Sequence, residues 1–363
     1  MADQAHPSGD GFLGIRTLVL TDPISPQVPI PFEYRHESGC FHPKYANRVV
    51  FIFEQPRCWG GSHVFEGFRQ STEIVDGMEI AFVTGGSGPA ILLLHGYPQN
   101  RFMWSRVAPL LARDFTVVCA DLRGYGDSAK PPAGPDCEAY SFRAMARDQV
   151  LLMERLGHSR FMVAGHDRGG RVGHRMVRDW PDRIAAFAAL DLVPTWRMYH
   201  SITRDLARTY WQWYFLPQPA PHPERMIGAD PDYYFEHCLG SNGGTTLDAF
   251  DPAVLAEYRR CWNNPAMIHA SCNDYRAGIG IDLQHDEDDQ GKILQCPVLA
   301  LWAGQGIMQT LFDIGAEWRS VADNVTTGTI AGGHFFLDHQ PEASAEALAT
   351  FFARNIQSAD MDG

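Results

Sequence analysis

Asp167 occupies the middle of a glycine-flanked segment of a kind that can raise a nucleophile above a β-sheet. The segment GHDRG, residues 165–169, follows the apolar run Phe161 to Ala164 and precedes a predicted helix. A tight strand-to-helix turn of the form G-x-nucleophile-x-G lifts its middle residue and needs glycine on both sides. An ionised carboxylate there faces the positive end of the helix and can attack an sp3 carbon to form an ester. We therefore predict that Asp167 is a nucleophile rather than part of a purely structural turn.

His334 is the predicted base. An ester on Asp167 must be hydrolysed by an activated water, which calls for a histidine and an acid that orients it. The expected chain order is nucleophile, acid, histidine, with the histidine in a loop after the last strand. His334 follows the apolar run that ends at Ile330 and fits this order, although one histidine among 15 carries little weight by itself.

Two positions are open to the orienting acid. The turn after the predicted strand 298–302, residues 303–307, contains no carboxylate, whereas Asp191 directly follows the predicted strand 184–190. Asp191 is the predicted acid and Asp313 is the fallback. Capping of the next helix near Pro194 is the structural alternative for Asp191.

A turn after the predicted strand 91–94 supplies candidate oxyanion donors. In His95-Gly96-Tyr97-Pro98, a sharp turn can aim the backbone N–H of Tyr97 at the reaction centre. Together with the backbone N–H of Arg168, it would form an oxyanion hole for ester hydrolysis.

The charge balance restricts the partners. The 363 residues include 30 Lys+Arg and 43 Asp+Glu, a formal net charge of −13, which disfavours nucleic acids and anionic membrane surfaces. An anionic small-molecule substrate would need a local cationic site. Arg168 adjoins the nucleophile and Arg171 returns to the same helix face, so their guanidinium groups could clamp a substrate carboxylate. The alternative is that both arginines only pair with Asp167 or other acids.

No metal or cofactor is expected. The eight cysteines are scattered without a C-x-x-C pair, which indicates neither a zinc site nor a disulfide framework. The first residues do not resemble a signal peptide, and no apolar run approaches bilayer length. These features predict a cytoplasmic, reduced protein.

The order of apolar runs and amphipathic stretches predicts an α/β fold with a mostly parallel, twisted sheet and helices on both faces. The predicted strands are residues 91–94, 115–120, 161–164, 184–190, 298–302 and 325–330, and the predicted helices are residues 103–113, 142–156, 171–178 and 343–355. The predicted domains are an N-terminal extension at residues 1–63, core segments at 64–194 and 277–363, and a helical cap at 195–276 between them. The extension is proline-rich, with one candidate strand at residues 49–53.

From residue 64 onward the sequence resembles the α/β-hydrolase superfamily, and within it the fluoroacetate (haloacetate) dehalogenases. The resemblance lies in segments 95–99, 121–126, 165–171, 190–195, 250–252, 274–278 and 333–335, with the D-R-x-x-R elbow as its most specific part. It implies hydrolysis of short 2-halocarboxylates, with Asp167, His334 and Asp191 in the roles given above and Arg168 and Arg171 binding the carboxylate. It also raises the expectation of a homodimer.

The resemblance implies that three further residues bind the leaving halide. At one of these positions the residue type differs from that of the family. Trp213 and Tyr275 match its halide donors, whereas Gln212 stands where the family has a histidine. An amide can donate a hydrogen bond but cannot become cationic, so fluoride departure should suffer more than chloride departure. Packing in the cap core is the alternative for the two aromatic residues.

Two other functions remain open. An epoxide hydrolase would need cap tyrosines to protonate the opening oxygen, and the candidates are Tyr199, Tyr210, Tyr214, Tyr233 and Tyr234. The arginine pair argues against this reading. A non-catalytic ligand-binding α/β-hydrolase is the third possibility, and the complete set Asp167, Asp191 and His334 argues against it.

Overall fold

The computed structural model describes residues 64–241 and 246–356. The extension at residues 1–63, including its candidate strand, lies outside the described residues. In the described part, no helix combines the length and the apolar character needed to cross a membrane.

Eight strands form one sheet in the order β1-β2-β4-β3-β5-β6-β7-β8. All neighbouring pairs from β4 to β8 are parallel, and only the pairs involving β2 are antiparallel. The strands are β1 Arg69–Val75, β2 Met78–Gly86, β3 Ala90–Leu94, β4 Thr116–Ala120, β5 Phe161–His166, β6 Ile184–Leu190, β7 Val298–Ala303 and β8 Val325–Ile330. Every residue of β3, β5 and β6 is buried, as expected for parallel strands covered on both faces. The predicted fold class and all six predicted strands are confirmed.

The hairpin of β1 and β2 is absent from the predicted elements. Its two strands are joined by Asp76 and Gly77, both at positive φ, 48° and 80°. An Asp-Gly pair between two strands favours a tight hairpin turn. The local signal was therefore present in the sequence.

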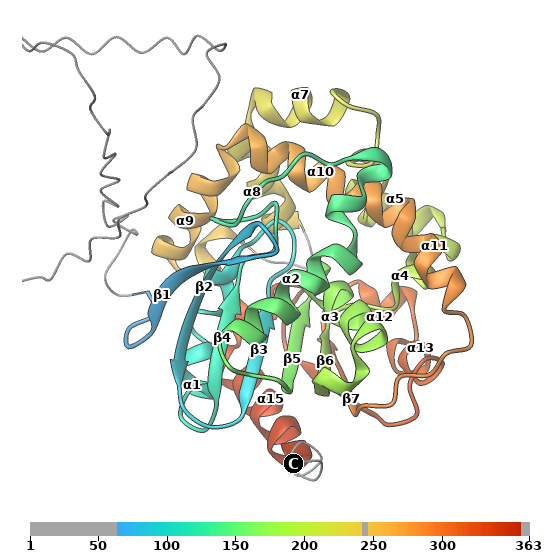
Figure 1. Cartoon of the computed structure of the whole chain (residues 1–363). Helices are drawn as coiled ribbons and strands as arrows, with labels where there is room; N and C mark the ends of the chain where they lie inside the picture. The colour runs from blue at the N-terminus through green and yellow to red at the C-terminus, as the bar shows by residue number, and fades with distance from the viewer. Residues whose placement is uncertain (1–63, 242–245, 357–363) are drawn as a thin grey trace, which may run out of the picture. The chain divides into compact units, whose positions relative to one another are not determined.

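Helices lie on both faces of the sheet (Figure 1), with α2 and α3 on one face and α1 and α15 on the other. The α-helices of the core are α1 Ala108–Leu111, α2 Phe142–Arg155, α3 Arg168–Asp179, α12 Met308–Leu311, α13 Ile314–Arg319, α14 Phe336–His339 and α15 Pro341–Asn355. The predicted helix at 103–113 is wrong. A 3-10 turn, Arg101–Trp104, is followed by α1, because Pro109 cannot continue a helix but is tolerated in the first turn of a new one.

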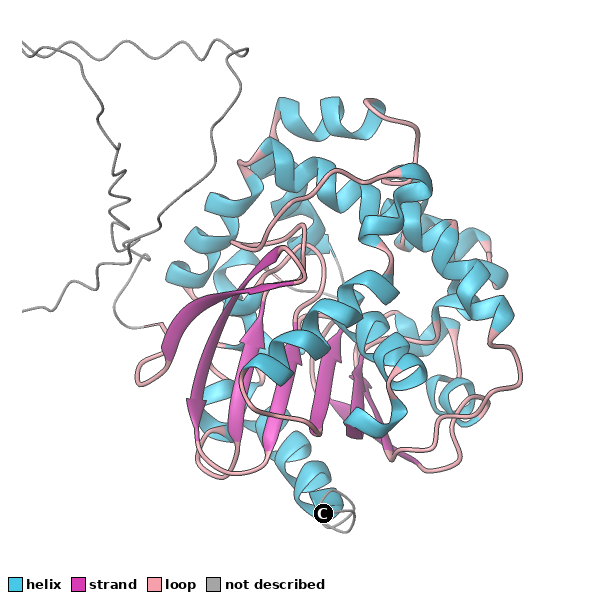
Figure 2. Cartoon of the chain, in the orientation of Figure 1, coloured by secondary structure: helices cyan, strands magenta, loops and turns pink. Residues whose placement is uncertain are grey.

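A second group of helices lies between β6 and β7 in the chain. They are α4 Thr195–His200, α5 Arg204–Thr209, α6 Gln212–Phe215, α7 His222–Ala229, α8 Pro231–Ser241, α9 Pro252–Trp262, α10 Pro265–Ile279 and α11 Ile281–Asp288. Figures 1 and 2 show helices of this group above one end of the strands. The long helix α10 continues across residue 276, where the sequence analysis placed the end of the cap.

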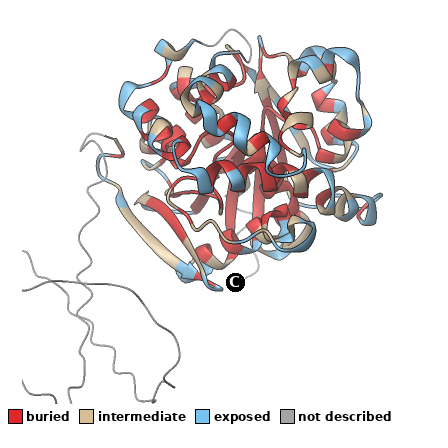
Figure 3. Cartoon of the chain, turned by 90° about the horizontal axis from the view of Figure 1, so that it is seen from above, coloured by how far each residue is buried: buried red, intermediate tan, exposed pale blue. Residues whose placement is uncertain are grey.

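Buried residues follow the strands and the inner sides of the surrounding helices, as the view along the sheet shows (Figure 3). Several ionisable side chains are buried with them, including Asp167, Arg168, Arg171, Asp191 and Asp274. Buried charges are costly unless they are paired. These groups therefore mark the part of the interior where chemistry is to be sought.

Candidate active site

Asp167 forms the turn between β5 and α3, with φ 46° and ψ −114°. A non-glycine residue in this region is strained, and such strain is typical of functional sites. The flanking glycines are needed for space. A Cβ atom on Gly165 would lie 2.3 Å from the carbonyl oxygen of Gly169, and one on Gly169 would lie 2.4 Å from the carbonyl oxygen of His95.

The Asp167 carboxylate is buried but kept ionised. Its Oδ2 accepts a hydrogen bond from the backbone N–H of Tyr97 at 3.1 Å, so this predicted oxyanion donor does face the carboxylate. Burial alone raises the pKa of Asp167, but the charges of His334 and Arg171 outweigh burial and lower it below its usual value. No contact defines the role of the second predicted donor, the N–H of Arg168, which stays a prediction.

His334 and Asp191 form a close pair. The Nδ1 of His334 lies 2.6 Å from Oδ2 of Asp191, and Oδ1 of Asp191 accepts from the backbone N–H of Ala303 at 3.0 Å. Burial lowers the pKa of His334, but the hydrogen bond to Asp191 and the charges of Asp191 and Asp167 outweigh it, and the pKa is raised. Asp191 thus contacts the histidine and the end of β7 rather than capping a helix.

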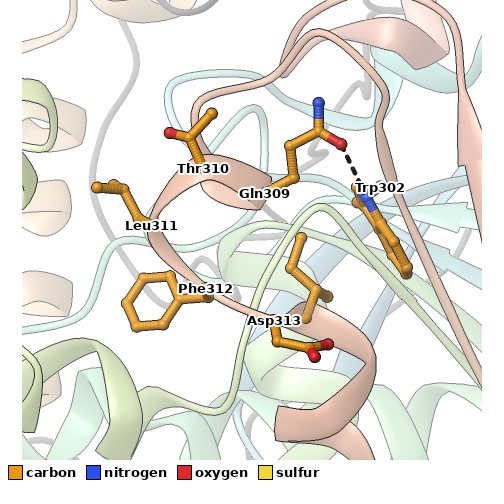
Figure 4. A pocket seen from close by; sticks show the side chains of 7 residues that line it. Trp302, Gln309, Thr310, Leu311, Phe312 and Asp313 are labelled. Atoms are coloured by element: carbon orange, nitrogen blue, oxygen red, sulfur yellow. Dashed lines mark hydrogen bonds between the residues drawn. The ribbon is translucent and has the colours of Figure 1, made fainter.

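Asp313, the fallback acid, has another task. Its Oδ1 accepts from the backbone N–H of Ala316 at 2.9 Å and so caps α13. It also lines an open pocket formed by Trp302 and residues 309–314 (Figure 4). The structure therefore brings Asp191, and not Asp313, to His334.

His166 is a residue of the site that the sequence analysis did not single out. Its buried imidazole lies against that of His334, with ring centroids 4.5 Å apart, and its Nε2–H donates to the backbone carbonyl of His334 at 2.9 Å. Burial and the charge of His334 lower the pKa of His166 to about 4, so it is neutral near pH 7. It therefore fixes the loop that carries His334. Its position directly before Asp167 was the available signal.

Arg168 is held by Asp274, a contact that the sequence did not reveal. The guanidinium donates from Nε to Oδ2 at 3.0 Å and from Nη2 to Oδ1 and to the backbone carbonyl of Asp274, the last at 2.8 Å. Tyr125 donates its hydroxyl to Oδ2 of the same carboxylate. Burial lowers the pKa of Arg168, but Asp274 outweighs burial and raises it. Only Nη1 of Arg168 is left without a partner among the described groups.

Arg171 makes no ion pair of this kind with any residue that the structure describes. Its Nη1 donates to the carbonyl of Val193 at 3.0 Å and to the hydroxyl of Thr195 at 3.1 Å, and its Nε has no partner among the described groups. Burial lowers the pKa of Arg171 to about 10, although the charge of Asp167 opposes this shift. Arg171 is therefore a buried cation, and the carboxylate that does most to stabilise its charge is the candidate nucleophile.

A small enclosed cavity adjoins Asp167 and His334. It is lined by Tyr97, Pro98, Asp167, Tyr210, Gln212, Trp213, Cys238, Tyr275 and His334. All three halide candidates, Gln212, Trp213 and Tyr275, therefore share one cavity with the nucleophile.

The two arginines lie behind the aromatic wall of this cavity. Neither is among its lining residues. The guanidinium carbon of Arg171 lies 4.4 Å from the ring centre of Trp213, and that of Arg168 lies 4.2 Å from the ring centre of Tyr275. Cation–π contacts of this kind stabilise a desolvated guanidinium. In this closed arrangement the aromatic rings separate the arginines from the reacting cavity.

Comparisons with known proteins identify the family of the chain. Residues 89–340 match the model of the family described as alpha/beta hydrolase fold. A fluoroacetate dehalogenase of Burkholderia sp is 52% identical over 290 residues, which cover 80% of this chain and 95% of that protein. A soluble epoxide hydrolase of Corynebacterium sp. (strain C12) is 33% identical, over 78% of this chain and 99% of that protein.

A solved structure is similar over the same extent. It is a protein of Nostoc sp PCC 7120, assigned provisionally to the alpha/beta hydrolases, with a TM-score of 0.78 and 46% identity. The match covers 79% of this chain and 99% of the Nostoc chain.

Proposed function

Because the chain belongs to the fluoroacetate dehalogenase family of the α/β-hydrolase superfamily, we propose that it hydrolyses short 2-halocarboxylates to 2-hydroxy acids and halide. The observation that carries this proposal is the ionised Asp167 on the strand-to-helix turn, between His334 on one side and two buried guanidinium groups on the other. A carboxylate nucleophile suits attack on a saturated carbon, and the guanidinium groups suit a substrate that is itself a carboxylate.

The first step forms an ester. One carboxylate oxygen of Asp167 attacks the halogen-bearing carbon, and the carbon–halogen bond breaks with its electron pair leaving on the halide. Since Oδ2 is hydrogen-bonded to the Tyr97 N–H, we assign the attack to Oδ1. Trp213, Tyr275 and Gln212 are the side chains of the cavity that can donate to the departing halide.

The second step hydrolyses the ester. His334 takes a proton from a water, and the resulting hydroxide adds to the Asp167 carboxyl carbon. The bond from this carbon to the ester oxygen, the former Oδ1, then breaks. That oxygen leaves with the product and takes the proton from His334, while the water oxygen remains in the Asp167 carboxyl group, which releases its proton. The negative charge that develops on Oδ2 is stabilised by the Tyr97 N–H, which already contacts this atom. The products are the 2-hydroxy acid, halide and one proton.

Charge changes couple the two steps. The negative charge of Asp167 is one of the causes that raise the pKa of His334. Ester formation removes that charge, so the pKa of His334 falls when its neutral form is needed as a base. His334 therefore becomes available as a neutral general base in the second step, after the ester has formed.

The test is release of halide and a trapped intermediate. We expect halide release from fluoro-, chloro- and bromoacetate by the wild type and none above background from Asp167→Asn, since an amide is a poor nucleophile. His334→Asn should still be alkylated and should accumulate the carboxymethyl ester on Asp167, visible by intact-protein and peptide mass spectrometry. Slow deamidation of the introduced asparagine must be excluded in Asp167→Asn. An unmodified His334→Asn protein after exposure to chloroacetate would contradict the two-step mechanism.

The halide preference tests the cavity. With Gln212 in place of a possible cationic donor, chloroacetate should be turned over faster than fluoroacetate. Gln212→His should raise fluoroacetate turnover more than chloroacetate turnover, by up to the 1.5–3 kcal/mol, roughly, of one hydrogen bond to a charged group. Rates of fluoride and chloride release at saturating substrate measure this. A wild type that already prefers fluoroacetate, with no gain in the variant, would contradict this role for residue 212.

Epoxide hydrolysis is the second candidate. Tyr210 lines the cavity beside Asp167, and the 33% identical relative is a soluble epoxide hydrolase. Of the other candidate tyrosines, Tyr233 is 71% exposed and is not suited to proton donation in a closed site. An epoxide panel run beside the haloacetates discriminates the two. Trapping of the ester also separates either enzyme from a non-catalytic binding protein.

A further inference from the structure

Three buried hydrogen-bond donors near the arginine pair have no partner among the described residues. They are Nη1 of Arg168, Nε of Arg171 and the hydroxyl of Tyr199 in α4, and we call them the donor pocket. Tyr199 is 7% exposed and both arginines are at most 2% exposed. Native proteins rarely leave such groups unsatisfied, so each one needs an explanation.

Two of the donors, Nη1 of Arg168 and the Tyr199 hydroxyl, lie close together. A Cβ atom placed on Gly278 in α10 would lie 3.3 Å from Nη1 of Arg168 and 3.4 Å from the hydroxyl of Tyr199. The Tyr199 hydroxyl also interacts electrostatically with both guanidinium groups. Its ring packs on Trp213 at 5.0 Å between centroids, and Trp213 in turn lies over Arg171. The pocket is therefore next to the wall of the reacting cavity.

The chemistry of the pocket favours an anion. Two of its members are guanidinium groups, which can only donate, and the third is a phenol whose pKa burial raises, so it is protonated near pH 7. A carboxylate accepts several hydrogen bonds at once. The charge of Asp282, whose Oδ2 is also unpartnered among the described groups, interacts with Arg168 and Tyr199, so a water is the alternative occupant that the experiments below must separate from a carboxylate.

We infer that Tyr199 is a specificity-determining residue, whose hydroxyl joins Arg168 and Arg171 in binding the carboxylate of the substrate. The inference rests on the proposed function and adds a third donor to the arginine pair. Asp274 contributes by occupying Nε and Nη2 of Arg168, which leaves Nη1 without a partner on a guanidinium that approaches Gly278.

Tyr199→Phe removes only the hydroxyl. We expect its KM for chloroacetate to rise about 10-fold or more, with kcat changed less than about twofold, because the bond is made equally before and during reaction. The inhibition constant of glycolate should rise by a similar factor. The kcat/KM for chloroacetamide, an uncharged substrate of the same shape, should stay unchanged.

Tyr140→Phe is the matched control. The Tyr140 hydroxyl is also attached to a buried ring, but it donates to the carbonyl of Pro131 at 2.7 Å, outside the donor pocket. Tyr140→Phe should lower the Tm and leave KM unchanged, because it breaks a hydrogen bond within the protein. Tyr199→Phe should do the reverse, because its hydroxyl has no such bond to lose.

Gly278→Ala tests the same pocket by filling it. The added methyl group would lie 3.3 Å from both terminal nitrogens of Arg168, a tight contact beside the place assigned to the carboxylate. Alanine is a better helix former than glycine, so loss of α10 would not explain a higher KM. We expect KM for chloroacetate to rise and KM for chloroacetamide to change less.

The outcomes separate this inference from the proposed function. Equal KM values for Tyr199→Phe and wild type with chloroacetate would show that the donors hold only water, and equal losses for chloroacetate and chloroacetamide would show a merely structural role. Either result overturns the inference while haloacetate turnover stands. If the wild type turns over no haloacetate, the proposed function fails, and calorimetric binding of acetate to wild type and Tyr199→Phe still decides whether Tyr199 binds carboxylates.

Discussion

Asp167 lies between two buried clusters of charge that differ in what they can change. The histidine side consists of His334 and Asp191, joined at 2.6 Å, and its histidine can gain or lose a proton near neutral pH. The arginine side consists of Arg168, Arg171 and Asp274. The two guanidinium groups on this side remain charged under the same conditions. The two sides therefore act on one carboxylate by different means.

The difference separates the tasks of the site. On the histidine side, ester formation changes the pKa of His334, so that side can respond to the progress of the reaction. On the arginine side, a bidentate ion pair fixes the orientation of Arg168 before any substrate arrives. A fixed donor suits recognition, because little has to reorganise on binding. We therefore expect variants of the histidine side to change turnover, and variants of the arginine side to change stability or KM.

The largest expected effect lies on the histidine side. Asp191→Asn keeps the shape but removes the charge that orients His334 and raises its pKa, and turnover should fall by about 10⁴-fold. The matched control is Asp313→Asn, which removes the same charge from the cap of α13 and should keep turnover within about twofold. Initial rates of halide release decide. Comparable losses in the two variants would contradict the assignment of the acid.

On the arginine side, the largest expected effect is on stability. Asp274→Asn leaves the guanidinium of Arg168 buried without its counter-charge, which costs about 3–5 kcal/mol of the free energy of unfolding. Urea denaturation followed by tryptophan fluorescence measures this. Arg143→Gln, which breaks a more exposed pair with Asp179, is the control and should cost less than about 1 kcal/mol. A loss for Asp274→Asn no larger than the control would show that Arg168 does not depend on this ion pair.

Arg171→Lys should change binding rather than folding. Lysine retains the charge but loses the planar fork, so the KM for chloroacetate should rise by about 10- to 100-fold, with a smaller change for neutral halides or epoxides. Steady-state kinetics with chloroacetate, chloroacetamide and an epoxide measure the contrast. Proportional losses for charged and neutral substrates would mean that Arg171 supports the cavity wall instead of a carboxylate.

The smallest expected effect is the pH dependence of stability. The pKa of His334 is raised in the folded protein, so its stabilising contribution is complete below the unfolded pKa of about 6.5 and is lost as pH rises through the folded value. The difference in unfolding free energy between wild type and His334→Gln should therefore shrink from mildly acidic to alkaline pH. Arg171→Lys, measured in parallel, should show no such trend over this range. A difference for His334→Gln that grows with pH would have the wrong sign.

The features that sequence predicted well are local ones. The turn around Asp167 is specified by neighbouring glycines, and the order of nucleophile, acid and histidine follows from the order of the parallel strands. Absence of a carboxylate at 303–307 left Asp191 as the choice, and the structure pairs it with His334. The hairpin of β1 and β2 and the break in the predicted helix 103–113 also have local signals in the sequence. These signals are the Asp76-Gly77 pair and Pro109.

Long-range partners were not predictable in the same way. Arg168 and Asp274 are 106 residues apart, and nothing in the spacing of either segment indicates the other. The sequence indicated Tyr199 only as a proton donor for epoxides, because its position near Arg168 depends on how α4 packs beside Gly278 of α10. The same holds for the aromatic wall between the arginines and the cavity, which no periodicity describes.

The acid at the end of β6 has a consequence for how such a site could evolve. Oδ1 of Asp191 accepts from the N–H of Ala303, so the turn after β6 contacts the last residue of β7, directly before the turn that follows that strand. A carboxylate supplied by either turn would approach the histidine from adjacent strands. Few substitutions would then be needed to move the acid from one turn to the other without rebuilding the sheet. The turn after β7, freed from catalysis here, is consequently a natural place for engineering libraries that leave the nucleophile and base untouched.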